Sequence, residues 1–140
     1  MWTIDHHQGD SVVSATAIGD FETNIARFRD DDRVNLLTCY AAMADVFPAM
    51  AEDVKFDFVF YDADHTAEAC EEFWKGVEPH LPCECRLLYD DADWDGMVRL
   101  GELAEAAGFQ DVTPRPLHRA SGDKSSPSTY TLRVMARYAG

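Results

Sequence analysis

The sequence predicts an α/β protein with an open, mostly parallel sheet, one antiparallel strand near the C-terminus and helices on both faces. Two observations support this prediction. Short apolar runs alternate with segments of helical periodicity along the 140 residues, which is the pattern of a parallel sheet covered by helices. The last apolar segment instead alternates residue by residue, as a half-buried antiparallel strand does. We expect residues 1–140 to form a single domain, because this length suffices for one hydrophobic core.

The first half of the chain contributes three expected strands and two expected helices. "MWTID" reads as a short strand that ends at Asp5, "VNLLTC" as the next strand, and "FDFVFY" as a central one. Apolar residues recur at helical spacing from Ile18 to Phe28, between the first two strands. Residues 43–53 read as a short helical piece, which Pro48 shortens because proline lacks a backbone N–H.

The second half contributes two longer helices and three strands. A helix is expected from Thr66, and its apolar face consists of Cys70, Phe73, Trp74 and Val77. "CRLLY" reads as a strand, and residues 94–107 read as an amphipathic helix that Gly108 stops in a left-handed conformation. The apolar face of that helix is Trp94, Met97, Val98, Leu100, Leu103, Ala104 and Ala107. "FQDV" and "STYTLRVMARY" read as the closing strands.

Composition excludes several classes of protein. Hydrophobic residues make up 46% of the chain, so it is neither disordered nor membrane-spanning. Lys and Arg number 12 against 26 Asp and Glu, which gives a net charge of −14. This charge disfavours binding to nucleic acid and to anionic membranes. "MWTIDHHQGD" lacks the basic start and apolar core of a signal peptide, so we expect a cytoplasmic protein.

Four cysteines are present, and we interpret them as free thiols, because free cysteine is commonly a small buried hydrophobe. "HLPCEC" offers His80, Cys83 and Cys85 as an alternative set of soft metal ligands. One histidine and two cysteines leave a tetrahedral site incomplete, which favours the first interpretation.

Acidic residues follow three of the expected strands. Asp5 ends the first strand, Asp62 and Asp64 follow "FVFY", and Asp90 and Asp91 follow "CRLLY". A single acid in such a place could cap a helix. Three acidic strand ends on the same edge of a parallel sheet would instead converge on one crevice, where such sheets bind ligands. Like charges this close favour a divalent cation as the counter-charge.

The residues resemble the class I S-adenosylmethionine-dependent methyltransferases, most closely the small-molecule O-methyltransferases of the catechol, macrolide and sugar type. These enzymes have a Rossmann-like fold. "WTID" is similar to their second strand, "VNLLTCYAAMADVFP" to the third strand and its turn, "FDFVFYDADHTAEACEEFWKGVEPHL" to the fourth strand and its helix, and "RLLYDDADW" to the fifth strand. The resemblance covers nearly the whole chain from Trp2.

The resemblance implies S-adenosylmethionine as cofactor and a hydroxyl of a small molecule as methyl acceptor. It assigns ribose binding to Asp5 and the turn around adenine to Cys39, Tyr40 and Ala41. His6 and Asp62 complete the implied cofactor-binding set.

The resemblance also implies a magnesium ion held by Asp62, Asp90 and Asp91, because oxygen ligands suit a hard cation. The metal would lower the pKa of the acceptor hydroxyl and orient it. Asp64 matches a position that serves as general base in sugar-methylating relatives, and His65 is the competing base because its ordinary pKa is near neutrality.

Two features depart from the family. Its first strand and Gly-rich loop would precede Met1, so we expect an N-terminally truncated, partial domain, and "PCEC" stands where the family turns with glycines. Three interpretations remain open. The chain could be a piece of a longer enzyme, it could be completed by a partner chain or a homo-oligomer that supplies the missing strand, or it could be a non-catalytic degenerate domain that acts as an interaction module.

Two families of phosphate-hydrolysing enzymes fit the sequence less well than the methyltransferases do. "FVFYDADHT" followed by "LLYDD" also resembles the haloacid-dehalogenase-like magnesium-dependent phosphatases, in which Asp62 would be the nucleophile. That family needs a Ser or Thr and a Lys on separate elements between the two motifs, and the interval holds one helix and one strand. "IDHH" resembles the Asp-His-His phosphoesterases, but there the motif follows other acidic motifs.

Overall fold

The computed structural model describes residues 2–4, 23, 26, 37–39, 43–114 and 132–139, and at residues 2, 3 and 37–39 it describes the backbone alone. Two compact units divide the chain, Met1–Met50 and Ala51–Gly140, and each is described by itself. The single domain expected over residues 1–140 stays a prediction.

The first unit contains two short parallel strands and a helix. β1 (Trp2–Ile4) pairs with β2 (Leu37–Cys39), in a register that sets Ile4 beside Cys39. α2 (Met43–Ala49) buries Phe47 and carries Pro48 next to its last residue. Because Pro48 has no N–H, the last turn of the helix lacks the bond that this residue would donate to the Ala44 carbonyl. All three elements were predicted, whereas the helix expected over residues 18–28 falls outside the described residues except at positions 23 and 26.

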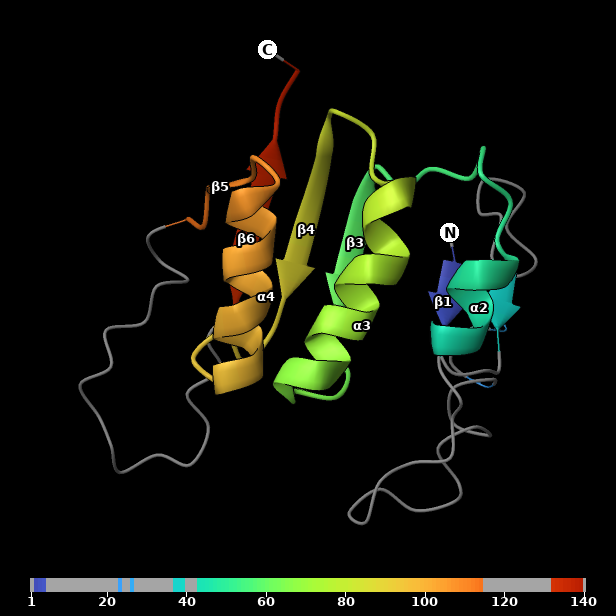
Figure 1. Cartoon of the computed structure of the whole chain (residues 1–140), viewed down its shortest axis with the longest axis horizontal. Helices are drawn as coiled ribbons and strands as arrows, with labels where there is room; N and C mark the ends of the chain where they lie inside the picture. Colours follow the sequence, from blue (N-terminus) through green and yellow to red (C-terminus); the bar gives the residue numbers. More distant parts are fainter. Residues whose placement is uncertain are drawn as a thin grey trace. The chain divides into compact units, whose positions relative to one another are not determined.

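The second unit is built on a four-stranded sheet with the order β3-β4-β6-β5 (Figure 1). β3 (Phe58–Tyr61) and β4 (Cys85–Tyr89) are parallel. β6 (Arg133–Arg137) runs antiparallel to both β4 and β5 (Gln110–Asp111). The mixed sheet confirms the expected open α/β architecture with an antiparallel strand near the C-terminus.

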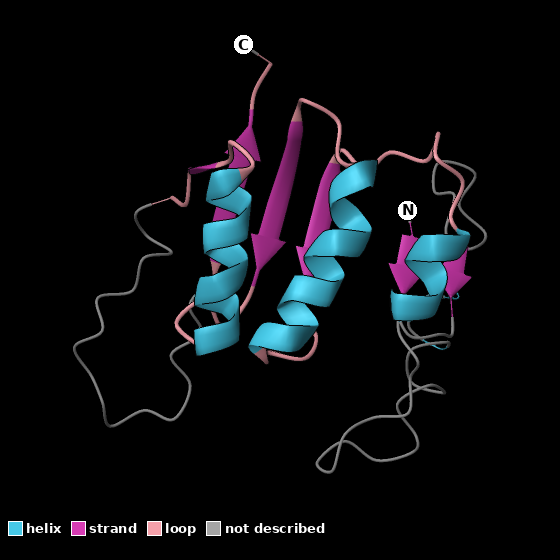
Figure 2. Ribbon diagram, in the orientation of Figure 1, coloured by secondary structure: helices cyan, strands magenta, loops and turns pink. Residues whose placement is uncertain are grey.

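Two helices cover one face of this sheet and pack side by side against each other (Figure 2). α3 (Ala67–Val77) follows β3 and leads into the short 3-10 helix η1 (Glu78–His80), and α4 (Asp95–Ala106) follows β4. Tyr61 stacks on Phe73 of α3 with ring centroids 4.2 Å apart, which identifies the covered face. Among the described residues of this unit no helix covers the opposite face, so only one of the two expected layers lies within them.

The core lies between the two helices and the sheet. Cys70, Phe73, Trp74 and Val77 of α3 are all buried, as their spacing predicted. On α4 the buried residues are Gly96, Met97, Leu100, Gly101 and Ala104. Trp94 and Val98, which the sequence placed on the apolar face, are instead 55% and 46% exposed. Trp94 is the N-cap residue before the helix, and Val98 lies one turn after it on the same side of α4, beside the buried stripe and not within it. Gly108 ends the helix with φ +88°, as expected.

Two arginines of β6 lie on the covered side of the sheet together with Met135. Arg137 donates to the carbonyls of Leu81 and Pro82 at 2.9 and 2.7 Å, and its guanidinium lies over the ring of Phe109. Arg133 forms an ion pair with Asp111 at 3.5 Å. The charged positions of this alternating strand therefore face the helix layer, where backbone carbonyls and a carboxylate replace their water.

In the part of the chain that the structure describes, none of the helices is long and apolar enough to cross a membrane. The predicted cytoplasmic location stays a prediction.

Replacement of Leu100, which is fully buried on α4, tests this packing. We expect Leu100→Ala to lower the free energy of unfolding by about 2–5 kcal/mol, because it removes buried methyl groups and leaves a cavity. Val98→Ala, at a half-exposed position two residues away, should cost less than about 0.5 kcal/mol. Urea unfolding of both variants measures the difference, and equal losses would contradict the assigned helix orientation.

Candidate functional site

The acids that follow β3 and β4 lie at the same edge of the sheet. The two parallel strands end in register, with Tyr61 beside Tyr89. Asp62 and Asp90 therefore leave the sheet at neighbouring points, and the Asp90 N–H still donates to the Tyr61 carbonyl at 3.4 Å. The predicted convergence of acidic strand ends is confirmed for these two strands.

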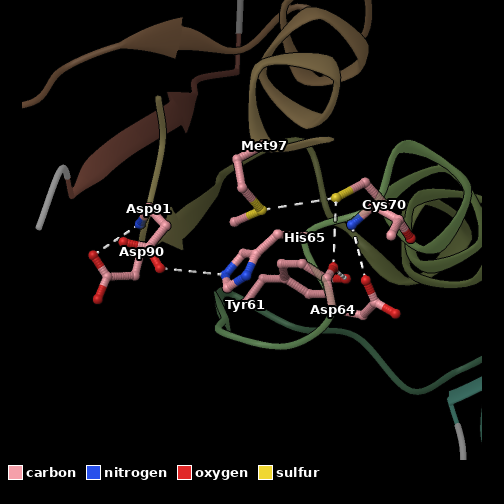
Figure 3. A network of polar contacts seen from close by, with 8 residues as sticks. Tyr61, Asp64, His65, Cys70, Asp90, Asp91 and Met97 are labelled. Atoms are coloured by element: carbon pink, nitrogen blue, oxygen red, sulfur yellow. Dashed lines mark hydrogen bonds and ion pairs between the residues drawn. The ribbon is translucent and has the colours of Figure 1, made fainter. Parts of the chain in front are cut away.

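Asp64 organises the loop between β3 and α3. Its carboxylate accepts the Thr66 N–H at 2.9 Å, and its carbonyl accepts the Tyr61 hydroxyl at 2.7 Å (Figure 3). Thr66 caps α3, because its side-chain oxygen accepts the Ala69 N–H at 3.3 Å. Burial raises the pKa of Tyr61, so this hydroxyl stays a donor at neutral pH. Asp64 thus has a structural role, and a catalytic role for it stays a prediction.

The loop between β4 and α4 is a tight turn centred on Asp91. Asp91 has φ +49°, in the left-handed region that few residues other than glycine adopt. The Asp91 N–H donates to the Asp90 carboxylate at 2.9 Å, and the Asp91 carbonyl accepts the Trp94 N–H at 2.9 Å. The turn points the Asp91 side chain toward the β3–α3 loop (Figure 3).

His65 meets Asp91 across the two loops. The His65 Nε2 lies 3.6 Å from the Asp91 Oδ2, longer than a hydrogen bond, and this nitrogen has no hydrogen-bond partner. The imidazole also packs against the indole of Trp94, with ring centroids 4.9 Å apart. About one-fifth of the His65 side chain is exposed, but its Nε2 is buried.

The surroundings of Asp91 disfavour the ionised form of its side chain. Burial raises the pKa of Asp91 above its ordinary value, and the negative charges of Asp90, Asp62 and Asp93 raise it further. His65 acts in the opposite direction. Partial removal from water and like charges both disfavour the ionised form. This edge of the sheet therefore suits a ligand that donates hydrogen bonds or carries positive charge.

The expected magnesium ligands agree with the site in chemistry but not in arrangement. Asp62, Asp90 and Asp91 offer the oxygen atoms that a hard cation prefers. Among the described residues, however, no three acidic, histidine or cysteine side chains gather into a metal-binding group. Asp90 binds a backbone N–H and Asp91 is directed at His65.

Most of the expected cofactor-binding residues lie outside the described part of the chain: Asp5, His6, Tyr40 and Ala41. Cys39 is the last residue of β2, and its backbone partner is Ile4, which directly precedes Asp5 in sequence. Asp62 is exposed beyond the end of β3. Their assignment to S-adenosylmethionine stays a prediction.

The possible soft-metal set is not formed. Cys70, Cys83 and Cys85 are free thiols, and only Cys83 is exposed. His80 is buried, with its Nδ1 2.9 Å from the Val54 carbonyl. Burial raises the pKa of Cys85, which opposes the thiolate form that a metal would need.

The sequence analysis did not predict two residues of the site. Trp94 was assigned to the core but contacts His65 at the surface. Gly96 lies so close to the His65 carbonyl that a side chain there would overlap the backbone. A glycine in the first turn of an amphipathic helix was the available signal for this close approach.

Comparison with solved structures identifies the fold. Over 99% of its length the chain superposes on the apo structure of a TDP-rhamnose 3′-O-methyltransferase of calicheamicin biosynthesis, with a TM-score of 0.65 and 11% identity. It superposes equally fully on an rRNA methylase from Streptococcus thermophilus, with a TM-score of 0.60 and 11% identity. The chain has the fold of the class I methyltransferases.

The chain spans 58% of the length of the first of these proteins and 87% of the second. At this low identity the likeness concerns the fold. No protein-family model matches the sequence, and no curated protein matches it either. The expected N-terminal truncation stays a prediction.

The left-handed backbone conformation of Asp91 and the like charges around its carboxylate give a prediction for the stability of the fold. Because its pKa is raised in the folded state, the folded protein binds the proton more tightly than the unfolded chain, and stability falls as the pH rises through the two values. We expect Asp91→Asn to be at least as stable as the wild type at neutral pH, since asparagine is neutral and also tolerates a positive φ.

The advantage of Asp91→Asn should vanish below about pH 4, where the carboxyl is protonated in both states. Urea unfolding from acid to neutral pH measures it. Glu102→Gln, which removes an exposed ion pair with Arg99, should lose rather than gain stability at neutral pH. A loss of stability in Asp91→Asn at neutral pH that is absent in acid would contradict the assignment.

Proposed function

We propose that the chain belongs to an S-adenosylmethionine-dependent O-methyltransferase, whose acceptor is a hydroxyl of a sugar, polyketide or phenol. The methyltransferase fold supports the reaction class. The observation that carries the proposal is the His65–Asp91 pair at the carboxyl ends of β3 and β4, where parallel sheets bind their ligands.

In this proposal the acceptor hydroxyl binds between His65 and Asp91. The His65 Nε2 is unsatisfied but buried, 3.6 Å from the Asp91 Oδ2, so in this proposal the imidazole turns to admit a hydroxyl that contacts both groups. His65 takes the hydroxyl proton, and the Asp91 carboxylate stabilises the imidazolium that forms. S-adenosylmethionine, when bound, supplies the methyl group on a sulfonium that leaves as a thioether. The acceptor oxygen gains a bond to carbon as the carbon–sulfur bond breaks, and positioning supplies most of the catalysis.

His65 suits the role of base better than Asp64. The Asp64 carboxylate is already bound to the Thr66 N–H, and the residue holds the loop at both its side chain and its carbonyl. The His65 nitrogen lacks a partner, and its ring is oriented by Trp94 and Asp91. We therefore assign Asp64 to positioning and His65 to proton transfer.

Cofactor binding is proposed for Asp5, His6, Cys39, Tyr40, Ala41 and Asp62, on the resemblance of their motifs. Magnesium assistance through Asp62, Asp90 and Asp91 is also part of the proposal, supported by the chemistry of the donors and by the mutual repulsion that raises the pKa of Asp91. Since these carboxylates form no group in the described residues, no step is assigned to a metal.

Calorimetric titration of the folded chain with S-adenosylmethionine tests the proposal first, because it needs no acceptor. We expect binding, followed by S-adenosylhomocysteine release with sugar or phenol acceptors. His65→Gln should leave cofactor affinity unchanged and lower kcat by about 10²–10⁴-fold.

Asp64→Asn is the matched control, because asparagine can still accept the Thr66 N–H. It should retain most of the activity. Loss of activity in Asp64→Asn with retention in His65→Gln would assign the base to Asp64. A folded chain that binds no S-adenosylmethionine would instead favour a piece of a longer enzyme or a non-catalytic domain.

Magnesium titration monitored by carboxyl NMR resonances tests the metal. We expect Asp62, Asp90 and Asp91 to shift together, because a bound cation would draw the three carboxylates into one coordination sphere. Glu102 and Glu105, on the far part of α4, should not shift. Uniform small shifts of all carboxyl groups would show that magnesium only screens an acidic surface. Magnesium would then no longer be part of the proposed function.

A further inference from the structure

Three residues of the segment that follows β4 contact His65. The Asp91 Oδ2 lies 3.6 Å from the edge of the imidazole at Nε2, and the indole of Trp94 packs against the ring, with ring centroids 4.9 Å apart. The third residue is Gly96, in the first turn of α4, and it contacts the His65 backbone. All of these contacts lie within the unit Ala51–Gly140.

The contact at Gly96 leaves no room for a side chain. A Cβ atom there would lie 2.0 Å from the His65 carbonyl oxygen, 2.6 Å from the His65 carbonyl carbon and 2.7 Å from the Thr66 carbonyl carbon. These three atoms belong to the backbone, so a change of rotamer cannot move them aside. Glycine is unfavourable inside a helix, and the close approach of two backbones is a physical reason for its presence.

Beyond Gly96, α3 and α4 meet through side chains. The Met97 Sδ lies 3.7 Å from the Cys70 Sγ, and the Arg99 Nε donates to the Glu71 carboxylate at 2.9 Å (Figure 3 shows the sulfur pair). Such side chains can change rotamer when a helix shifts, whereas two backbones in contact cannot. The Gly96 contact therefore sets how closely the start of α4 approaches the β3–α3 loop.

Both groups of the candidate site are joined to the elements that meet at Gly96. The Asp91 carbonyl accepts the Trp94 N–H at 2.9 Å, and the Trp94 carbonyl accepts the Val98 N–H at 2.8 Å, so the acidic turn continues directly into α4. On the other side, the carbonyl that Gly96 approaches is that of His65 itself. A displacement at Gly96 therefore changes the position of the imidazole relative to the Asp91 carboxylate.

We propose that Gly96 is a positioning residue of the candidate site, because its missing side chain sets the distance between His65 and Asp91. Its role in catalysis rests on the proposed methyl transfer, in which His65 takes the proton of the acceptor hydroxyl. In that reaction Gly96 fixes the His65 backbone, and the imidazole turns about this fixed point. A misplacement of reacting groups by about 1 Å can lower a rate by about 10²-fold.

The variant Gly96→Ala tests the proposal by adding one methyl group. A Cβ atom essentially never lies within 3.0 Å of another heavy atom, so the 2.0 Å contact forces a movement of about 1 Å. We expect kcat to fall by about 10²-fold, with an unchanged KM for S-adenosylmethionine.

Gly76→Ala is the matched control, because it adds the same methyl group at a half-buried position of α3. It should leave kcat unchanged. Since alanine has the higher helix propensity, it should also leave the stability of the fold equal or improved. Circular dichroism checks that both variants are folded.

NMR at a fixed pH gives a readout that needs no activity. The indole of Trp94 shifts the ring-proton resonances of His65, because the ring centroids are 4.9 Å apart, and Trp94→Leu supplies the values without this effect. We expect Gly96→Ala to move the His65 resonances toward those of Trp94→Leu. Gly76→Ala should leave them at their wild-type values.

The wild-type chain provides a second measurement that holds even if Gly96→Ala does not fold. We expect a nuclear Overhauser effect between the α-protons of Gly96 and the backbone protons of Thr66, because a Cβ on Gly96 would lie 2.7 Å from the Thr66 carbonyl carbon. Its absence from a folded chain would overturn the proposal.

Two further results would overturn it. One is a folded Gly96→Ala variant that keeps the wild-type His65 resonances or the wild-type kcat. The other is an equal effect of Gly76→Ala, which would indicate a general response to alanine in these helices. If the wild type itself transfers no methyl group, the proposed function fails, and the His65 resonances still decide whether Gly96 positions the ring.

Discussion

The parallel, in-register pairing of β3 and β4 is the constraint on which the site depends. Because Tyr61 and Tyr89 end their strands side by side, the two loops that follow leave the sheet at the same edge. The helices after those loops then pack against each other on one face. With the strand ends and the helix starts both fixed, the loops have little freedom. His65 and Asp91 meet as a consequence of this geometry.

Most interactions around the site stabilise the folded state, whereas the ionised Asp91 carboxylate destabilises it. Tyr61 and Thr66 fix the first loop, and Gly96 allows α4 to approach the His65 backbone. Asp91 stands in a left-handed conformation among like charges, and its pKa is raised. Residues that destabilise the folded state in this way are common where a protein binds or transforms a ligand. The remaining structure stabilises the unfavourable group through packed helices and an ordered sheet.

The sequence by itself determined the elements and much of the core. Spacing along α3 and the position of Gly108 predicted burial and termination correctly, because helical period and backbone sterics act locally. The acids after β3 and β4 were likewise visible as strand ends. Only the tertiary structure decided that Trp94 lies on His65 and that β6 turns its arginines toward the helices. Those outcomes depend on contacts between segments far apart in sequence, which local pattern does not encode.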